Sequence, residues 1–480
     1  MTKLEISEIK SNLHLLKDNY GTAVFHGESY RLFQVGGRIA NALQRIEETP
    51  WEDVDKGFLD LEEELCSLQR LYQETKDEGM SDLEEVRKGS RCFYLFVSQE
   101  CNLKCLYCYG DGGSYKKGQM LMGEVTLKNF FERCITERNV AYDILFFGGE
   151  PLLNLPLLKK AVEMGNQKKT DGFQITFNMV TNGTVFSPEI SQFMADHINS
   201  VTISLDGPKE YHDLQRCSGG DWSSHDLAVE TISALQAADT RLSIRTIVTK
   251  KNYADIEKVY RYNLGLNPRG VGITPVDVPT NHPLYLTGEE YRRMADEISR
   301  ISCENLLALT SEDEPAYYEF SYALLERLYT KRKRFYACGA GRAQFGVAAD
   351  GEVYPCHRFV GMRDFYLGNV NNENFYFRNL AQAGEVFTPL SVHEIEDCRQ
   401  CWARYLCGGC CYLQSHLYKG SLAKPLSRYC YFKRKVYHDL LLTFKQVMLS
   451  PEKVNRLNHN LKSSLERFKG YQDGYTNHVI

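Results

Sequence analysis

Three cysteines lie close together in the segment CNLKCLYC at residues 101–108. They are Cys101, Cys105 and Cys108, spaced C-x3-C-x2-C. Soft thiolates bind zinc or iron-sulfur clusters, and a structural zinc site takes four ligands, commonly from two C-x2-C pairs. A cubane [4Fe-4S] cluster needs one outer ligand for each of its irons. Three cysteines would therefore leave one iron open to bind another molecule.

The whole chain of 480 residues holds 16 cysteines, and a second group of them gathers in its last third. The N-terminal sequence MTKLEISEIKSNLHLL is charged and lacks the apolar segment of a signal peptide, and no run of 18 apolar residues could span a membrane. Cysteine-rich chains without these signals use thiols for metal ligation more often than for disulfides. We therefore expect a cytoplasmic metalloprotein without a membrane partner.

The length and composition of the chain are those of an ordinary globular protein of two or three domains, with 43% hydrophobic and 25% charged residues. The formal net charge is -5, which disfavours a nucleic-acid partner because phosphate binding needs a basic surface.

Strand-like and helix-like segments alternate between residues 91 and 275. This alternation predicts a parallel sheet with crossover helices, and the number of units predicts a partial (β/α)6 barrel within an α/β fold. The cysteine triplet follows the first strand, at the end of the barrel where chemistry usually occurs. The predicted strands are CFYLFVS, YDILFFG, FQITFNMVT, SVTISLD, LSIRTIV and GVGITPV.

Later strand ends carry further motifs, namely GGEP at 148–151, TNG at 181–183, SLDGP at 204–208 and Arg216. Alone, GGEP could be a simple turn. Together with CNLKCLYC, however, these segments resemble the radical S-adenosylmethionine (radical SAM) enzymes. The resemblance implies that the open iron binds SAM, whose reductive cleavage gives a 5'-deoxyadenosyl radical. It implies SAM contacts from Tyr107, Gly148, Gly149, Glu150, Pro151, Asn182, Ser204, Asp206 and Arg216.

The C-terminal segment CRQCWARYLCGGCC and its flanking cysteines resemble the SPASM extension of peptide-modifying radical SAM enzymes. That resemblance implies two auxiliary [4Fe-4S] clusters, and hence three clusters in all. The outer cluster would take Cys398, Cys401, Cys407 and Cys430, and the inner cluster Cys338, Cys356 and Cys411. The fourth inner ligand stays open between the adjacent Cys410, another residue type, and an open iron for a substrate thiolate. A zinc ribbon is the alternative.

His357 follows Cys356 in YPCHRF, where sulfatase-maturing relatives carry the aspartate that serves as their base. Formylglycine formation is therefore less expected. His357 is either a base, which the ordinary pKa of histidine permits, or a structural neighbour of the cluster.

The first 85 residues predict a separate unit with a strand pair turning at residues 26–27 and two amphipathic helices. This unit resembles the winged-helix-like RiPP recognition element, which binds the leader of a ribosomally made precursor peptide by strand addition. A plain helical cap is the alternative. The expected domains are 1–85, the barrel at 90–310, SPASM at 311–450, and a tail at 451–480.

The whole chain resembles thioether-forming maturases of the ranthipeptide and sactipeptide groups. The resemblance implies a bond from a substrate cysteine sulfur to a side-chain carbon, of Asp or Glu in the ranthipeptide group. We expect a flavodoxin or ferredoxin as electron donor. Maturation of a quinone-cofactor protein subunit, another peptide crosslink, and a non-catalytic iron-sulfur electron carrier stay open. The precursor, the attacked carbon and the oligomeric state are not readable from the sequence.

Overall fold

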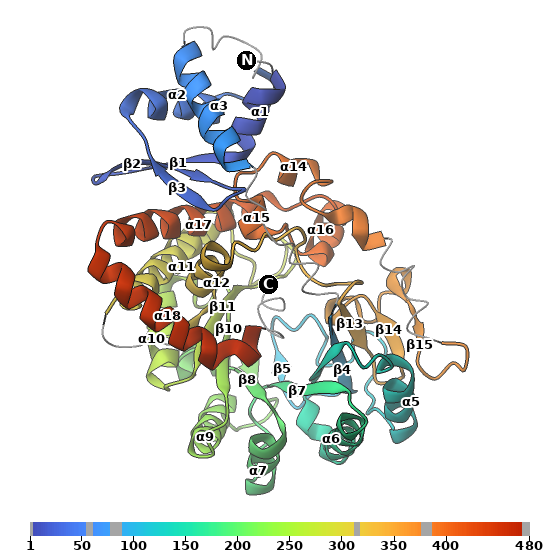
Figure 1. Cartoon of the computed structure of the whole chain (residues 1–480). Helices are drawn as coiled ribbons and strands as arrows, with labels where there is room; N and C mark the ends of the chain where they lie inside the picture. The colour runs from blue at the N-terminus through green and yellow to red at the C-terminus, as the bar shows by residue number, and fades with distance from the viewer. Residues whose placement is uncertain (1–2, 54–60, 77–88, 312–316, 376–385, 473–480) are drawn as a thin grey trace.

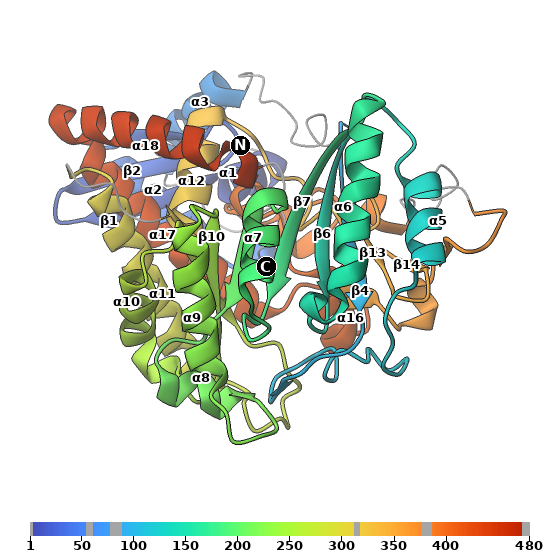
Figure 2. The ribbon, with the colours of Figure 1, turned by 90° about the horizontal axis from the view of Figure 1, so that it is seen from below.

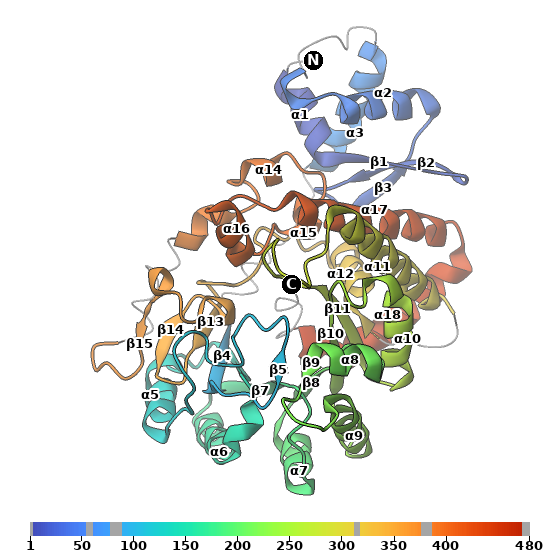
Figure 3. The same ribbon diagram turned by 180° about the vertical axis from the view of Figure 1, so that it is seen from behind.

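The computed structural model describes residues 3–53, 61–76, 89–311, 317–375 and 386–472. Figure 1 shows an N-terminal unit at one end of the molecule, seated over helix α17 (Ser427–Met448). The barrel strands lie below this helix. Residues 344–375, drawn in orange, lie on the side of the barrel where its first strand, β4 (Ser90–Ser98), lies (Figure 1 and Figure 3).

The N-terminal unit combines a three-stranded antiparallel sheet, ordered β1-β2-β3, with three helices. The predicted strand pair is present as β2 and β3, whereas β1 was not predicted. In β1, Leu13 and Leu15 pack on the helices while Leu16 faces the rest of the protein, as the period of a strand requires. The winged-helix assignment stays a prediction, and most of the polar run predicted as a linker lies outside the described residues. The elements are α1 (Lys3–Asn12), β1 (Leu13–Asp18), β2 (Gly21–His26), β3 (Arg31–Gln34), α2 (Gly37–Glu48), η1 (Trp51–Asp53) and α3 (Glu62–Lys76).

The six predicted barrel strands are all present and pair in parallel in chain order, which confirms the partial barrel. Their residues are mostly buried, as expected for parallel strands covered by helices. Figure 2 shows helices such as α6, α7 and α9 lining one side of this sheet. The strands after β4 are β6 (Ala141–Gly148), β7 (Gln174–Thr181), β8 (Ser200–Ser204), β10 (Leu242–Val248) and β11 (Gly270–Pro275). The helices are α5 (Glu124–Cys134), η3 (Pro151–Asn154), α6 (Leu155–Thr170), α7 (Pro188–His197), α8 (Lys209–Gln215), α9 (Ser224–Ala237), η4 (Tyr253–Asp255), α10 (Ile256–Gly265) and α11 (Gly288–Ala308).

The C-terminal region extends the same sheet instead of forming a detached layer. Strand β13 (Gln344–Val347) pairs in parallel with β4, and β14 (Glu352–Tyr354) and β15 (Gly368–Asn369) follow it in antiparallel pairing. At the opposite edge, β12 (Tyr317–Tyr318) pairs with β11. The cysteine-rich segments are therefore fixed directly to the first barrel strand.

Short helices carry the cysteine-rich segments, and two long helices complete the chain. Residues 451–472, part of the predicted tail, form α18. Every described helix is either too short or too polar to cross a lipid bilayer. The remaining elements are β5 (Lys104–Cys105), β9 (Arg216–Cys217), α12 (Glu319–Thr330), η5 (His357–Phe359), η6 (Arg363–Phe365), η8 (Thr388–Leu390), α14 (Glu396–Arg399), α15 (Arg404–Cys407), α16 (Tyr412–Lys419) and α18 (Pro451–Gln472).

Candidate active site

The cysteine loop is held against the end of β6 by two glycines. Gly148 has a φ of +131°, and a Cβ there would lie 2.0 Å from the Ser98 carbonyl oxygen. A Cβ on Gly149 would lie 2.1 Å from the Glu100 carbonyl oxygen. Because both side chains are absent, the backbone N–H of Gly149 donates to Ser98 O at 2.8 Å. The sequence GG therefore positions the segment that leads into Cys101.

The three thiols open onto one cavity of about 320 Å³ at the carboxyl ends of the barrel strands. Burial raises the pKa of Cys101 to about 11 and that of Cys105 to about 12. Thiolates are the form that binds iron, so cluster loading must displace these protons. The three thiols share this cavity with polar residues from the ends of the strands. This arrangement fits the predicted cluster, which three cysteines would hold and whose fourth iron would take a small-molecule ligand. Of the predicted SAM contacts, the cavity is lined by Tyr107, Gly148, Gly149, Asn182, Ser204 and Arg216.

Glu150, Pro151 and Asp206 are absent from the lining of this cavity. The Glu150 carboxylate instead accepts hydrogen bonds from the Thr181 hydroxyl at 2.8 Å and from the backbone N–H groups of Leu152 and Asn182. Burial raises the pKa of Glu150 to about 7, while these hydrogen bonds act to lower it. Its carboxylate thus ties η3 to the end of β7. A SAM contact from the Glu150 side chain would require exchange of these partners, so its predicted role stays a prediction.

Asp206 joins two of the predicted residues into a buried network. Its carboxylate accepts from the Tyr107 hydroxyl at 2.5 Å and from Arg216 Nε at 3.0 Å. The Arg216 guanidinium also lies 5.3 Å from the centre of the Tyr107 ring. Residues 104–105 and 216–217 form the short ladder β5–β9, which brings Arg216 beside the cysteine loop. Asp206 therefore orients the residues that line the cavity.

The cysteine loop has a second anchor that the sequence reasoning missed. Asn182 Nδ2 donates to Asn102 Oδ1 at 2.9 Å and lies 3.7 Å from Cys101 Sγ. Asn102 in turn donates to the Thr184 hydroxyl at 2.8 Å. Asn102 lies within CNLKCLYC and Thr184 directly follows TNG, so their closeness to these motifs was the signal that could have identified them.

The opposite wall of the cavity comes from the C-terminal region and the last barrel strand. His357 stacks on Tyr94 with ring centres 4.1 Å apart and lines the cavity, and its role as a base or as a structural neighbour of the cluster stays a prediction. Arg358 and Asp277 also line it and form an ion pair. Neither of these two was predicted, because 81 residues separate them in the sequence.

Cys338, Cys356 and Cys411, the predicted inner set, lie close enough to influence one another electrostatically. Burial first, and then the neighbouring thiols Cys338 and Cys411, raise the pKa of Cys356. Arg358 Nη1 donates to Cys411 Sγ at 3.4 Å. The inner set therefore adjoins the cavity that holds the first three thiols.

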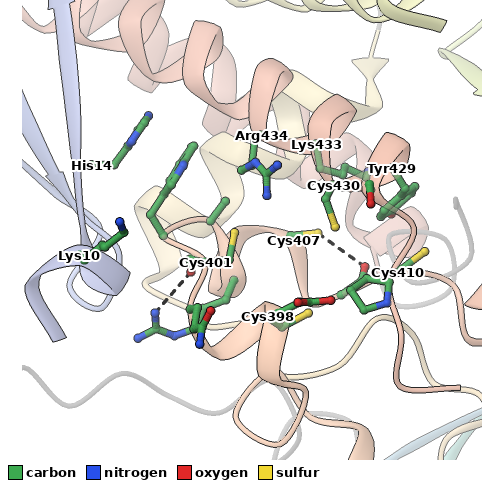
Figure 4. A pocket seen from close by; sticks show the side chains of 18 of the residues that line it. Lys10, His14, Cys398, Cys401, Cys407, Cys410, Tyr429, Cys430, Lys433 and Arg434 are labelled. Atoms are coloured by element: carbon green, nitrogen blue, oxygen red, sulfur yellow. Dashed lines mark hydrogen bonds between the residues drawn. The ribbon is translucent and has the colours of Figure 1, made fainter. Parts of the chain in front are cut away.

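The predicted outer set lines a different cavity, of about 540 Å³, between the C-terminal region and the N-terminal unit. Figure 4 shows the thiols of Cys398, Cys401, Cys407 and Cys430 in this pocket, together with that of Cys410. Cys410 therefore lines the outer cavity, although it directly precedes Cys411 of the predicted inner set. Within the described ranges, no three Cys, His, Asp or Glu side chains are gathered tightly enough for a single metal ion.

A tyrosine hydroxyl supports the fit of the outer cavity to a bound group. Tyr429 lines the cavity and is only 6% exposed, and its hydroxyl has no hydrogen-bond partner among the described residues. A buried hydroxyl without a partner is costly, so an acceptor bound in the cavity would satisfy it. Cluster sulfides are acceptors of this kind.

The N-terminal unit closes one side of the outer cavity. Lys10 and His14 line it from the side of α1 and β1 (Figure 4). His14 stacks on Trp402 with ring centres 3.7 Å apart, and Arg404 donates to the Ser11 carbonyl oxygen at 2.5 Å. The outer cysteines are thus enclosed by two units of the chain.

Comparisons with known proteins agree with this geometry. A model of the radical SAM superfamily matches residues 95–262, and a model of the SPASM iron-sulfur cluster-binding domain matches residues 338–402. The cysteine-type anaerobic sulfatase-maturating enzyme of Clostridium perfringens is 28% identical over 331 residues, covering 65% of this chain and 86% of that enzyme.

Two solved structures resemble the fold. The structure of anSMEcpe with bound AdoMet covers 78% of this chain and 98% of its own, with a TM-score of 0.66 and 23% identity. The structure of Streptococcus suis SuiB bound to its precursor peptide SuiA covers 87% of this chain and 98% of its own, with a TM-score of 0.50 and 12% identity. At sequence identities of 23% and 12%, these two structures show a shared fold and nothing further.

Proposed function

The chain is a radical SAM protein with a SPASM domain, and on that premise we propose that it installs thioether crosslinks in a ribosomally made precursor peptide. Relatives and neighbours with peptide or protein substrates support the general class, a maturase of such substrates. The bond from a substrate cysteine sulfur to a side-chain carbon is the finer part of the proposal.

One observation carries this proposal. The cavity lined by Cys101, Cys105 and Cys108 reaches Arg358, which contacts Cys411 of the inner set. A substrate in this cavity would stand between the two thiol groups. The inner set offers three cysteines, and Cys410 lines the outer cavity, which favours an inner iron that is free to take a substrate thiolate.

When bound, the clusters and SAM supply a 5'-deoxyadenosyl radical that removes a substrate hydrogen, and an acceptor for the electron released as the carbon–sulfur bond forms. The chain's own residues supply orientation and exclusion of water. Arg216, fixed by Asp206, would hold an anionic part of SAM. Tyr94, Phe147 and His357 form an aromatic wall that limits water around the reacting carbon.

His357 is the proposed proton acceptor for the substrate thiol, because its ring lines the cavity within the same turn as Cys356. The N-terminal unit is proposed to hold the peptide leader along an edge of its sheet, which raises the local concentration of the core peptide. A cytoplasmic location and a flavodoxin or ferredoxin donor complete the proposal.

Anaerobic incubation of the reconstituted protein with SAM and dithionite tests the enzyme class. We expect 5'-deoxyadenosine from the parent and none from a Cys105→Ala variant. A non-catalytic electron carrier would give none from either protein.

Mass spectrometry of a precursor peptide co-expressed with the enzyme tests the thioether. A crosslink removes the mass of two hydrogens and protects the cysteine from alkylation. The similarity to a cysteine-type sulfatase maturase favours a second candidate, oxidation of a cysteine to formylglycine. That product loses its sulfur and reacts with carbonyl reagents, so the two outcomes are distinct.

A further inference from the structure

Arg358 places a buried positive charge against one of the inner thiols. Its Nη1–H group donates to Cys411 Sγ at 3.4 Å, and its Nη2 group pairs with the Asp277 carboxylate. The side chains of Arg358 and Asp277 are 11% and 13% exposed, respectively. A charge interaction in such a shielded position is stronger than one at the surface.

Asp277 is held in place by residues on a different element. The Tyr418 hydroxyl of α16 donates to Asp277 Oδ1 at 2.8 Å, while Arg358 takes the other oxygen. Burial acts to raise the pKa of Asp277, but Arg358 and the hydrogen bonds outweigh it and lower the pKa. The carboxylate therefore stays charged and fixes the guanidinium in its contact with Cys411.

We propose that Arg358 is a positioning residue that raises the reduction potential of the inner auxiliary cluster by donating to Cys411. This inference rests on the proposed function, because it needs Cys338, Cys356 and Cys411 to hold a cluster. Reduction adds a negative charge to a cluster, and a nearby cation stabilises the reduced form more than the oxidised form. Asp277 opposes this effect, but it is not in direct contact with the sulfur.

The position of Arg358 explains why a higher reduction potential of the inner cluster would matter for the reaction. Its guanidinium lies 5.5 Å from the ring centre of Tyr109, the residue after Cys108, so it stands between the two thiol groups. Closing the carbon–sulfur bond forms one bond, releases the thiol proton to a base and leaves one electron. Cys338, Cys356 and Cys411 would hold an oxidised cluster that supplies the acceptor for that electron, and a higher potential would favour the transfer.

Redox titration of the holoenzyme, followed by electron paramagnetic resonance, tests the inference. We expect Arg358→Gln to lower the equilibrium constant for reduction of one auxiliary cluster about tenfold, or ~59 mV for a one-electron couple. Arg358→Lys should recover part of this shift. Arg434→Gln is the matched control, since Arg434 hydrogen-bonds to Cys401 of the outer set and should move only the other auxiliary signal.

Arg358→Lys keeps the test decisive if Arg358→Gln fails to fold. An ammonium keeps the charge but cannot use two separate nitrogens to reach Cys411 and Asp277, so the same potential should fall by part of the shift. Unchanged potentials in fully loaded Arg358→Gln or Arg358→Lys protein would overturn the role of Arg358. If the iron content and the spectra of the parent protein show no inner cluster, that result would instead overturn the cluster assignment in the proposed function.

Discussion

Replacing Gly149 by alanine should disable the first cluster site while leaving the chain folded. The new Cβ would lie 2.1 Å from Glu100 O, 2.5 Å from Glu100 C and 3.0 Å from Cys101 N. Contacts between backbone and Cβ need more than 3 Å, so the segment before Cys101 must move by about 1 Å. The backbone of Gly149 is not left-handed, and the effect is therefore one of space alone.

The loss in the free energy of unfolding caused by Gly149→Ala can be estimated from the contacts that must change. Overpacking costs about 1–3 kcal/mol. The shift also strains the bonds from Gly149 N to Ser98 O and from Glu150 N to Glu100 O, each 2.8 Å long and worth about 1 kcal/mol. A total of about 3–5 kcal/mol does not exceed the usual stability of a folded domain. A displacement of about 1 Å at a reacting centre can still lower the rate about 100-fold.

Iron analysis and 5'-deoxyadenosine formation check this prediction. We expect up to a third of the iron to be lost, which corresponds to one of the three predicted clusters, and SAM cleavage to fall about 100-fold. Gly265→Ala is the matched control, because a Cβ there meets no atom within 4 Å. Normal iron content and normal SAM cleavage in Gly149→Ala would refute the steric argument.

Three further predictions address other parts of the molecule. Cys430→Ala should lose the outer cluster, whereas Cys410→Ala should keep its iron; the reverse result would reassign the ligands. His357→Gln should lower crosslinking about 100-fold but leave SAM cleavage intact, and equal loss of both would exclude a role as the proton acceptor. Burial first, and then Lys333 and Arg404, lower the pKa of His26 to about 4, below its ordinary 6.5. The free energy of unfolding should therefore fall as the pH drops from 6.5 to 4, by up to ~1.4 kcal/mol per unit, and a His26→Gln variant measured by denaturant unfolding should lack this slope.

The barrel and its cysteine loop could be predicted because their signals are local. Each strand is a continuous apolar segment followed by a turn, and the three thiols fall within eight residues. Strand β1 was missed because His14 and Lys17 interrupt its apolar residues, and its pattern makes sense only once both faces of the sheet are covered. Leu16 faces α17, a helix more than 400 residues away in the sequence.

Contacts between distant segments account for the rest of the site. Asp277 lies two residues after the last barrel strand, and Arg358 lies two residues after Cys356 in the C-terminal region, so the continuous sheet brings them together. The orientation of Cys410 was unreadable for a different reason. Gly408 and Gly409 have φ values of 77° and 110°, and this left-handed turn decides which thiol faces which cavity.

The N-terminal unit and the outer cysteines depend on the same short segment, residues 401–405. Trp402 stacks on His14, and the Tyr405 carbonyl oxygen accepts from the Tyr30 hydroxyl at 2.8 Å. A Cβ on Gly27 would lie 2.9 Å from the Trp402 carbonyl oxygen, which shows how closely the two backbones approach. Cys401 begins this segment and faces the outer cavity. We therefore expect a displacement of Cys401 to shift the surface that contacts the N-terminal unit. The position of this unit and the geometry of the outer cavity are coupled through this segment.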